Sequence, residues 1–121
     1  YNLELETMDI PFYSILPDMD ALITDYSSIV FDFLLLNRPM AFTLDDYETY
    51  KRRRGFVFSD PLEFMPGEQI MEAKDFYRFL QHCLNNEDNY KQQRMEINNR
   101  VNLYKNGGNC QRILEFVGIY K

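Results

Sequence analysis

The residues with the most chemical potential form a short polar turn. Asp25, Tyr26, Ser27 and Ser28 follow four apolar or β-branched residues, 21–24. Serines at a helix start can offer hydroxyl and backbone N–H groups to an anion, and such charge-assisted hydrogen bonds contribute roughly 1.5–3 kcal/mol each. Serine is also a preferred N-cap residue in helices of any function. Ser27 and Ser28 by themselves are therefore equally consistent with helix capping and with anion binding. Ser27 and Ser28 are therefore a candidate diphosphate site.

Two carboxylates flank this turn. Asp32 lies four residues after Ser28, on the same face of an expected helix whose other residues are apolar. A buried unpaired carboxylate is costly, so that face must be open or partnered. Because a carboxylate repels a diphosphate, we expect Asp32 to accept hydrogen bonds from ligand hydroxyls or a base amino group. Asp25 favours a structural role, binding backbone N–H groups of the turn, with ligand contact as the alternative.

The elements around the turn are those of an α/β fold. Residues 21–24 predict a buried parallel strand, 29–36 a helix buried between the sheet and a second layer, and 40–43 a second, parallel strand. Residues 37–39 end the helix, because a residue that precedes proline disfavours helical geometry. In open α/β sheets ligands gather beyond the carboxyl ends of the strands, which is where the polar turn would lie.

Weaker patterns fill the rest of the chain. We expect a short strand within residues 1–10, a short helix after Pro11, a helical turn at 45–50, a left-handed cap at Gly55, strand composition at 56–58 and a loop at Pro66-Gly67. Helices are expected from Ala73 to about residue 84, over 87–104 and over about 110–119. The first should bury Phe76, Phe79, Leu80, Cys83 and Leu84; the last should pack Ile113, Leu114, Phe116 and Val117.

The amino-acid composition favours some classes of protein and excludes others. With 121 residues and 45% hydrophobic content, the chain has enough apolar surface for a single domain, residues 1–121. Its net charge of −6 speaks against a nucleic-acid binder. Cys83 and Cys110 fall in separate expected helices without metal-ligand spacing, so we expect reduced, packed thiols in a cytosol-like compartment and no metal. We expect neither a membrane span nor a signal peptide, and the start in mid-pattern suggests a fragment.

The single histidine does not point to catalysis. His82 falls off the apolar stripe of the helix expected from Ala73, and no partner in the sequence would orient it. We interpret it as an exposed helix residue, and predict no catalytic residue in the chain.

The run from Leu22 to Phe33, LITDYSSIVFDF, resembles the C-terminal signature of the CDP-glycerol glycerophosphotransferase family, the teichoic-acid primases and polymerases with a glycosyltransferase-B-type fold. Later features agree in order: Arg38-Pro39, Arg54-Gly55-Phe56-Val57-Phe58, Pro66-Gly67 and Gly107-Gly108-Asn109. The resemblance implies a partial Rossmann-like domain with a short parallel sheet and C-terminal helices, the C-terminal fragment of a nucleotide-donor-binding domain.

The resemblance also implies roles for particular residues. Ser27 and Ser28 would bind the diphosphate of CDP-glycerol or a related CDP-polyol, Asp32 would contact the same donor, and Arg54 would face the donor cleft. The acceptor of the intact protein would be lipid-linked or polymeric, and no metal or cofactor would be needed. The family's catalytic histidines lie in motifs upstream of this signature, so the fragment is expected to be inactive.

The basic run and the function of the chain each have alternative interpretations. The run Lys51 to Arg54 is either a solvated loop or a contact to phosphate or to an anionic membrane, which would place a cytoplasmic protein peripherally at the inner face of the cell membrane. The chain could also be a fragment of a nucleotide-sugar glycosyltransferase. A non-catalytic regulatory module with Asp25 as phosphoacceptor is disfavoured, because 121 residues do not supply its five-stranded sheet and further carboxylates.

Overall fold

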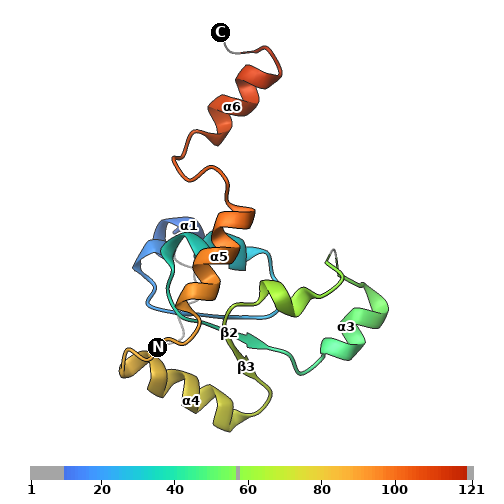
Figure 1. Cartoon of the computed structure of the whole chain (residues 1–121), viewed down its shortest axis with the longest axis vertical. Helices are drawn as coiled ribbons and strands as arrows, with labels where there is room; N and C mark the ends of the chain where they lie inside the picture. The colour runs from blue at the N-terminus through green and yellow to red at the C-terminus, as the bar shows by residue number, and fades with distance from the viewer. Residues whose placement is uncertain (1–9, 57, 120–121) are drawn as a thin grey trace.

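The computed structural model describes residues 10–56 and 58–119 as an α/β fold (Figure 1). Its described strands form one parallel sheet in the order β1 (Leu22–Thr24), β2 (Met40–Thr43) and β3 (Glu68–Ile70). The first two strands were predicted, including their parallel pairing. The third was not: strand composition pointed to 56–58, yet Phe56 and Phe58 are irregular and Val57 lies outside the described residues. The strand expected within 1–10 also falls outside them, apart from Ile10, which is irregular.

The sheet is centred on β2 and not on the strand before the polar turn. All but the last residue of β2 are buried, whereas Ile23 in β1 is 37% exposed. The prediction of a buried first strand was wrong: Leu22 and Thr24 are only partly buried, and β1 is an edge strand of the described sheet. Gly67, in the predicted loop, lets the chain pass β2 closely: a Cβ there would lie 2.2 Å from the carbonyl oxygen of Met40.

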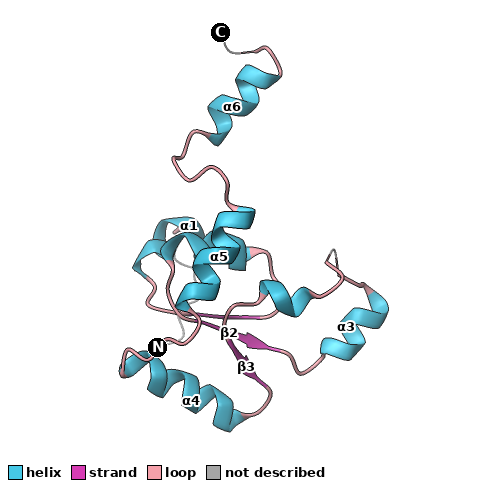
Figure 2. Ribbon diagram, in the orientation of Figure 1, coloured by secondary structure: helices cyan, strands magenta, loops and turns pink. Residues whose placement is uncertain are grey.

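Helices cover both faces of the sheet (Figure 2). On one face Met40 and Phe42 pack with α2 (Ile29–Phe33), the 3₁₀ helix η3 (Leu34–Leu36) and α5 (Lys91–Val101). On the other, Ala41 packs with α4 (Ala73–Leu84). The predicted burial of the helix after Ser28 is therefore confirmed along its inner side, and it ends at Asn37, which adopts a left-handed conformation with φ of 49°.

Short helices complete the body. Pro11 precedes α1 (Phe12–Ile15), which continues as the 3₁₀ helix η2 (Leu16–Asp18), and η4 (Pro61–Phe64) precedes β3. The turn predicted at 45–50 is a longer helix, α3 (Tyr47–Arg53), so most of the basic run is helical and not a loop. Gly55 follows α3 with φ of 69°, as predicted.

The predicted apolar face of α4 is buried only in part. Phe79 is 2% exposed, but Phe76, Leu80 and Leu84 are exposed, Leu84 by 82%. The reason is the width of the sheet: α4 packs on β3, and three short strands cannot cover a twelve-residue helix.

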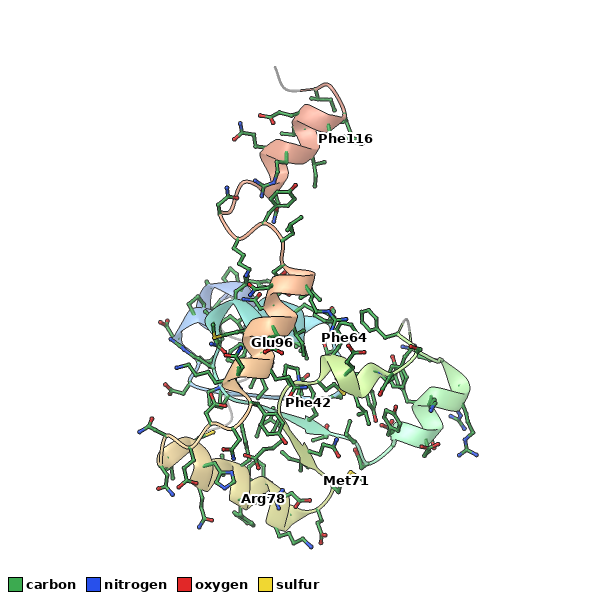
Figure 3. All side chains as sticks on the ribbon, viewed as in Figure 1. Phe42, Phe64, Met71, Arg78, Glu96 and Phe116 are labelled. Carbon is green, nitrogen blue, oxygen red and sulfur yellow. The ribbon has the colours of Figure 1, made fainter. Side chains whose placement is uncertain are left out.

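The last helix, α6 (Asn109–Phe116), stands away from the body (Figure 1). The predicted packing of Ile113, Leu114, Phe116 and Val117 is wrong, since all four are exposed. Phe116 is 91% exposed and lies at the outer part of this helix, whereas Phe42 lies within the body (Figure 3). The helix predicted over 87–104 is shorter, since α5 ends at Val101, and Gly107 adopts a φ of 71° in the segment between α5 and α6.

A fully buried arginine ties α5 to the start of β2. Arg94 is 0% exposed. Its guanidinium donates to both carboxylate oxygens of Asp88, and its Nε donates to Oδ1 of Asn37 over 3.2 Å. Burial of Asp88 opposes its ionisation, but the hydrogen bonds and charge of Arg94 outweigh this and lower the pKa of the carboxyl. The sequence predicted only a helix over 87–104 and missed this network.

Candidate functional site

The polar turn lies at the edge of the sheet where all three strands end. Asp25 Oδ1 accepts a hydrogen bond from the backbone N–H of Ser27 over 3.0 Å, which confirms the predicted structural role of this carboxylate. Ser28 stands at the N-cap position of α2, but its side chain makes no capping hydrogen bond. Ser27 and Ser28 are both exposed. Capping by the serine hydroxyls therefore does not account for the pair.

The two serines lie at a cavity of about 240 Å³, and half of the residues that line it are aromatic. Two ring pairs define it: Tyr26 and Tyr50, with ring centroids 4.5 Å apart, and Phe58 and Phe64, stacked at 3.9 Å. The remaining residues that line it with them are Val30, Phe31, Gly55, Phe56, Pro61 and Met65. Flat apolar walls beside exposed hydroxyls suit a ligand with a planar ring joined to a polar or anionic group.

A hydrogen bond holds one wall of the cavity in place. The Tyr26 hydroxyl donates to Oδ1 of Asp46 over 3.0 Å, joining the turn after β1 to the start of α3. Burial, followed by the bond to Asp46 and nearby carboxylates, raises the pKa of Tyr26 far above its ordinary range. The bond to Asp46 thus ties the Tyr26 ring to the start of α3, and the raised pKa disfavours ionisation of its hydroxyl. The sequence did not single out Asp46, although its place just after β2 puts it at the same edge as Asp25.

Asp32 does not line the aromatic cavity. Its Oδ2 accepts a hydrogen bond from the Tyr13 hydroxyl over 3.2 Å, and that bond, with the carboxylate charge, raises the pKa of Tyr13. It borders a separate hollow with Leu16, Pro17, Leu35 and Leu36. The expectation of an open or partnered carboxylate is confirmed, since Asp32 is exposed and bonded. Ser28 and Asp32, expected on one face of the helix, nevertheless line different hollows.

Arg54 is exposed directly after α3 and does not itself line the cavity, whereas the next residue, Gly55, does. Of the five residues singled out from the sequence, the structure thus brings Ser27 and Ser28 to the cavity itself. Asp25 shapes the turn that presents them, Arg54 precedes the cavity residue Gly55, and Asp32 borders the separate hollow.

The prediction that His82 is an exposed helix residue without a partner was wrong, because His82 is partly buried and contacts two carboxylates. Its Nδ1 lies 2.7 Å from Oε1 of Glu68, and its Nε2 lies 3.7 Å from a carboxylate oxygen of Glu87. The sequence missed this contact because Glu68 belongs to β3, the strand that was not predicted. His82 lines a third hollow, with Asp20 and Arg38, and shares none with Ser27.

The cysteines are both free, as predicted. Cys83 is half-buried and burial raises the pKa of its thiol, but Cys110 is exposed, which contradicts the predicted packing. Among residues 10–56 and 58–119, no group of three or more His, Cys, Asp and Glu side chains could hold a metal ion. No helix in the same residues has the length and apolar character needed to cross a membrane.

Known proteins resemble this chain along most of its length. It is 31% identical over 105 residues to the teichoic acid glycerol-phosphate primase of Bacillus subtilis (strain 168), covering 87% of this chain and 26% of the relative. It is 30% identical over 110 residues to the teichoic acid ribitol-phosphate primase of Bacillus spizizenii (strain ATCC 23059 / NRRL B-14472 / W23), covering 89% and 27%. The teichoic acid poly(glycerol phosphate) polymerase of Bacillus subtilis (strain 168) is 60% identical over 57 residues, covering 46% and 8%.

The chain therefore spans about a quarter of the length of the primases that it matches. No solved structure matches it significantly. Residues 6–118 match the family described as CDP-Glycerol:Poly(glycerophosphate) glycerophosphotransferase. The match covers nearly the whole sequence, including the turn at Ser27 and Ser28 and the residues that line the aromatic cavity. The chain belongs to this glycerophosphotransferase family, together with the teichoic acid primases and polymerases.

Proposed function

We propose that this chain is the donor-binding part of a transferase that moves glycerol phosphate, or a related polyol phosphate, from a CDP-activated donor during the synthesis of a teichoic-acid-like polymer. The observation that carries the proposal is the exposed Ser27-Ser28 turn at an aromatic-walled cavity, beyond the carboxyl end of β1. Family membership supports the choice of a CDP-polyol as the donor.

The arrangement of hollows suggests how the donor lies. In this proposal the cytosine ring enters the aromatic cavity beside Tyr26 and Phe56, and the diphosphate meets the hydroxyls of Ser27 and Ser28. The polyol then crosses the first turn of α2, where Asp32 accepts hydrogen bonds from its hydroxyls. Asp32 already accepts one hydroxyl bond, from Tyr13, which supports such a contact. Arg54, next to the rim, adds positive charge near the diphosphate.

This chain contributes binding and, in the proposal, no catalytic group. His82 is held by Glu68 in another hollow, so it is not available to the Ser27-Ser28 turn. Attack by an acceptor hydroxyl on phosphorus would rely on residues elsewhere in the longer protein. That protein would be cytoplasmic, associated peripherally with the inner face of the membrane, and its acceptor would be lipid-linked or polymeric. The chain would form the C-terminal part of a glycosyltransferase-B-type, Rossmann-like domain.

Calorimetric titration of the full chain with CDP-glycerol tests the proposal. We expect Ser27→Ala with Ser28→Ala to weaken binding at least tenfold, because each lost charge-assisted bond is worth roughly 1.5–3 kcal/mol. Asp32→Ala should weaken it less, since its partner is a neutral hydroxyl.

Ser14→Ala is the matched control, because Ser14 is also exposed but its hydroxyl donates to Pro11 and lies in neither hollow. Unchanged affinity in the double serine variant would contradict the proposal. Tighter binding of a UDP-sugar than of CDP-glycerol would instead support a nucleotide-sugar transferase.

A further inference from the structure

The basic surface, Lys51 to Arg54, stands out in a chain whose net charge is −6. All four residues are exposed, and within the described part of the chain none of them forms an ion pair. Several cations elsewhere are paired: Lys74 with Glu72, Arg78 with Asp75, Arg94 with Asp88, and Arg100 with Glu63. Four further cations of the described residues form no ion pair either, but they are scattered along the sequence: Arg38, Lys91, Lys105 and Arg112. Unpaired positive charge is thus densest in the consecutive run from Lys51 to Arg54.

Contacts within α3 account for little of this charge. Arg52 Nε donates to the carbonyl oxygen of Glu48 over 3.2 Å, and Lys51 Nζ lies 5.9 Å from the centroid of the Tyr47 ring. Cations in a last helical turn also interact favourably with the helix dipole, by about 0.3–1 kcal/mol each. The helix dipole favours a basic residue at the C-terminal end of α3. It is equivalent to only about half a negative charge, however, and does not neutralise four basic side chains.

The basic surface adjoins the cavity. The chain passes from β2 into α3 at the carboxyl edge of the sheet, and α3 lies at the side of the molecule (Figure 1). The run ends at Gly55, and both Gly55 and Phe56 line the aromatic cavity. An elongated anion on this surface would therefore reach the rim at which Ser27 and Ser28 lie.

The surface carries charge without an apolar face for lipid insertion. Membrane-surface helices present large apolar side chains beside their cations. In α3 the aromatic residues Tyr47 and Tyr50 face the body instead, with ring centroids 5.5 Å and 5.1 Å from that of Phe56. A purely electrostatic partner fits this surface better than a bilayer.

We propose that Lys51 to Arg54 bind a linear polyanion, the phosphodiester-linked polyol chain that serves as acceptor. The inference rests on the proposed function, because the polymer would be the transferase's own product. Adjacent unpaired cations match a chain that carries one negative charge per repeat, and binding releases its condensed counterions, as for nucleic acids. The same surface then directs the end of the polymer toward the donor cavity.

The test measures fluorescence anisotropy of labelled poly(glycerol phosphate) with the full chain across a range of salt concentrations. Lys51→Gln, Arg52→Gln and Arg53→Gln together leave Arg54 in place. We expect this triple variant to lose affinity about tenfold or more at low salt and to show a shallower salt dependence. The control triple, Lys74→Gln, Lys91→Gln and Lys105→Gln, removes the same charge from other exposed positions and should bind like wild type.

Equal affinity of the wild type and the Lys51 triple, or an equal loss in both triples, would overturn the inference. The inference would also be overturned if the Lys51 triple variant kept polymer binding but lost binding to phosphatidylglycerol vesicles, because that result would identify a membrane contact. CDP-glycerol titration of the same proteins separates the two proposals. If the wild type binds polymer through this surface but does not bind CDP-glycerol, the donor proposal fails and the polyanion surface remains.

Discussion

The two edges of the sheet use their polar residues in opposite ways. At the amino edge, Asp88 and Asn37 both accept hydrogen bonds from Arg94, which is wholly buried. At the carboxyl edge, Asp25 and Asp46 hold the backbone and a tyrosine ring, while the hydroxyls of the intervening serines remain exposed. The amino edge is a structural clamp, whereas the carboxyl edge leaves the serine hydroxyls exposed to solvent.

The comparison predicts that the largest loss of stability comes from the amino edge. Arg94→Met keeps the apolar stem but leaves Asp88 and Asn37 without their partner, and breaking a buried pair in this way costs about 3–5 kcal/mol. Urea denaturation followed by circular dichroism measures the free energy of unfolding. Arg100→Met, in an exposed pair with Glu63, should cost less than about 1 kcal/mol. If Arg94→Met and Arg100→Met lost similar amounts of stability, the buried clamp would be no more important than an exposed ion pair.

Acid should weaken the same clamp. The pKa of Asp88 is lower in the folded chain than its ordinary value of 3.8, so its contribution is present above that value and is lost as pH falls through the folded pKa. Stability measured between pH 5 and about pH 2 should therefore fall less steeply in Asp88→Asn than in wild type. Part of the slope will remain, because bonds from the Met71 and Glu72 amides also lower the pKa of Asp75. Parallel curves would contradict this assignment.

At the carboxyl edge the expected stability change is smaller, while ligand binding changes more. Tyr26→Phe removes the hydrogen bond to Asp46 and should cost about 1 kcal/mol of stability. The freed ring should also weaken CDP-glycerol binding, which calorimetry measures. Tyr77→Phe, an exposed tyrosine on α4, is the control and should change neither quantity. A Tyr26 variant with wild-type stability and affinity would show that the bond does not organise the cavity.

The smallest effect is expected outside both edges, on the uncovered part of α4. Leu84→Gln should change the free energy of unfolding by no more than about 0.5 kcal/mol, because Leu84 is already 82% exposed. Phe79→Ala on the same helix should cost about 3–5 kcal/mol, since Phe79 is buried against the sheet. Thermal or urea unfolding distinguishes the two, and a large loss in Leu84→Gln would mean that another surface covers this end of α4.

Local pattern was sufficient for the elements with strong signals. The bounds of β2, the start and end of α4, the left-handed Gly55 and the Asp25 turn were all predicted, because each depends on residues close in the sequence. Strand β3 was missed because Glu68–Ile70 is short and mixes polar with apolar residues. It becomes a strand by pairing with β2, which only the folded chain provides.

What the sequence by itself determined was the polar turn, its position after a strand and the resemblance that led to the family. Tertiary structure decided which of the candidate residues meet. It placed Ser28 and Asp32 at different hollows, joined His82 to Glu68, surrounded the serines with aromatic rings from later segments and left α6 exposed. The physical reason is that hydrogen-bonded turns and helix caps form between near neighbours, whereas burial, ion pairing and cavity walls depend on residues far apart along the chain.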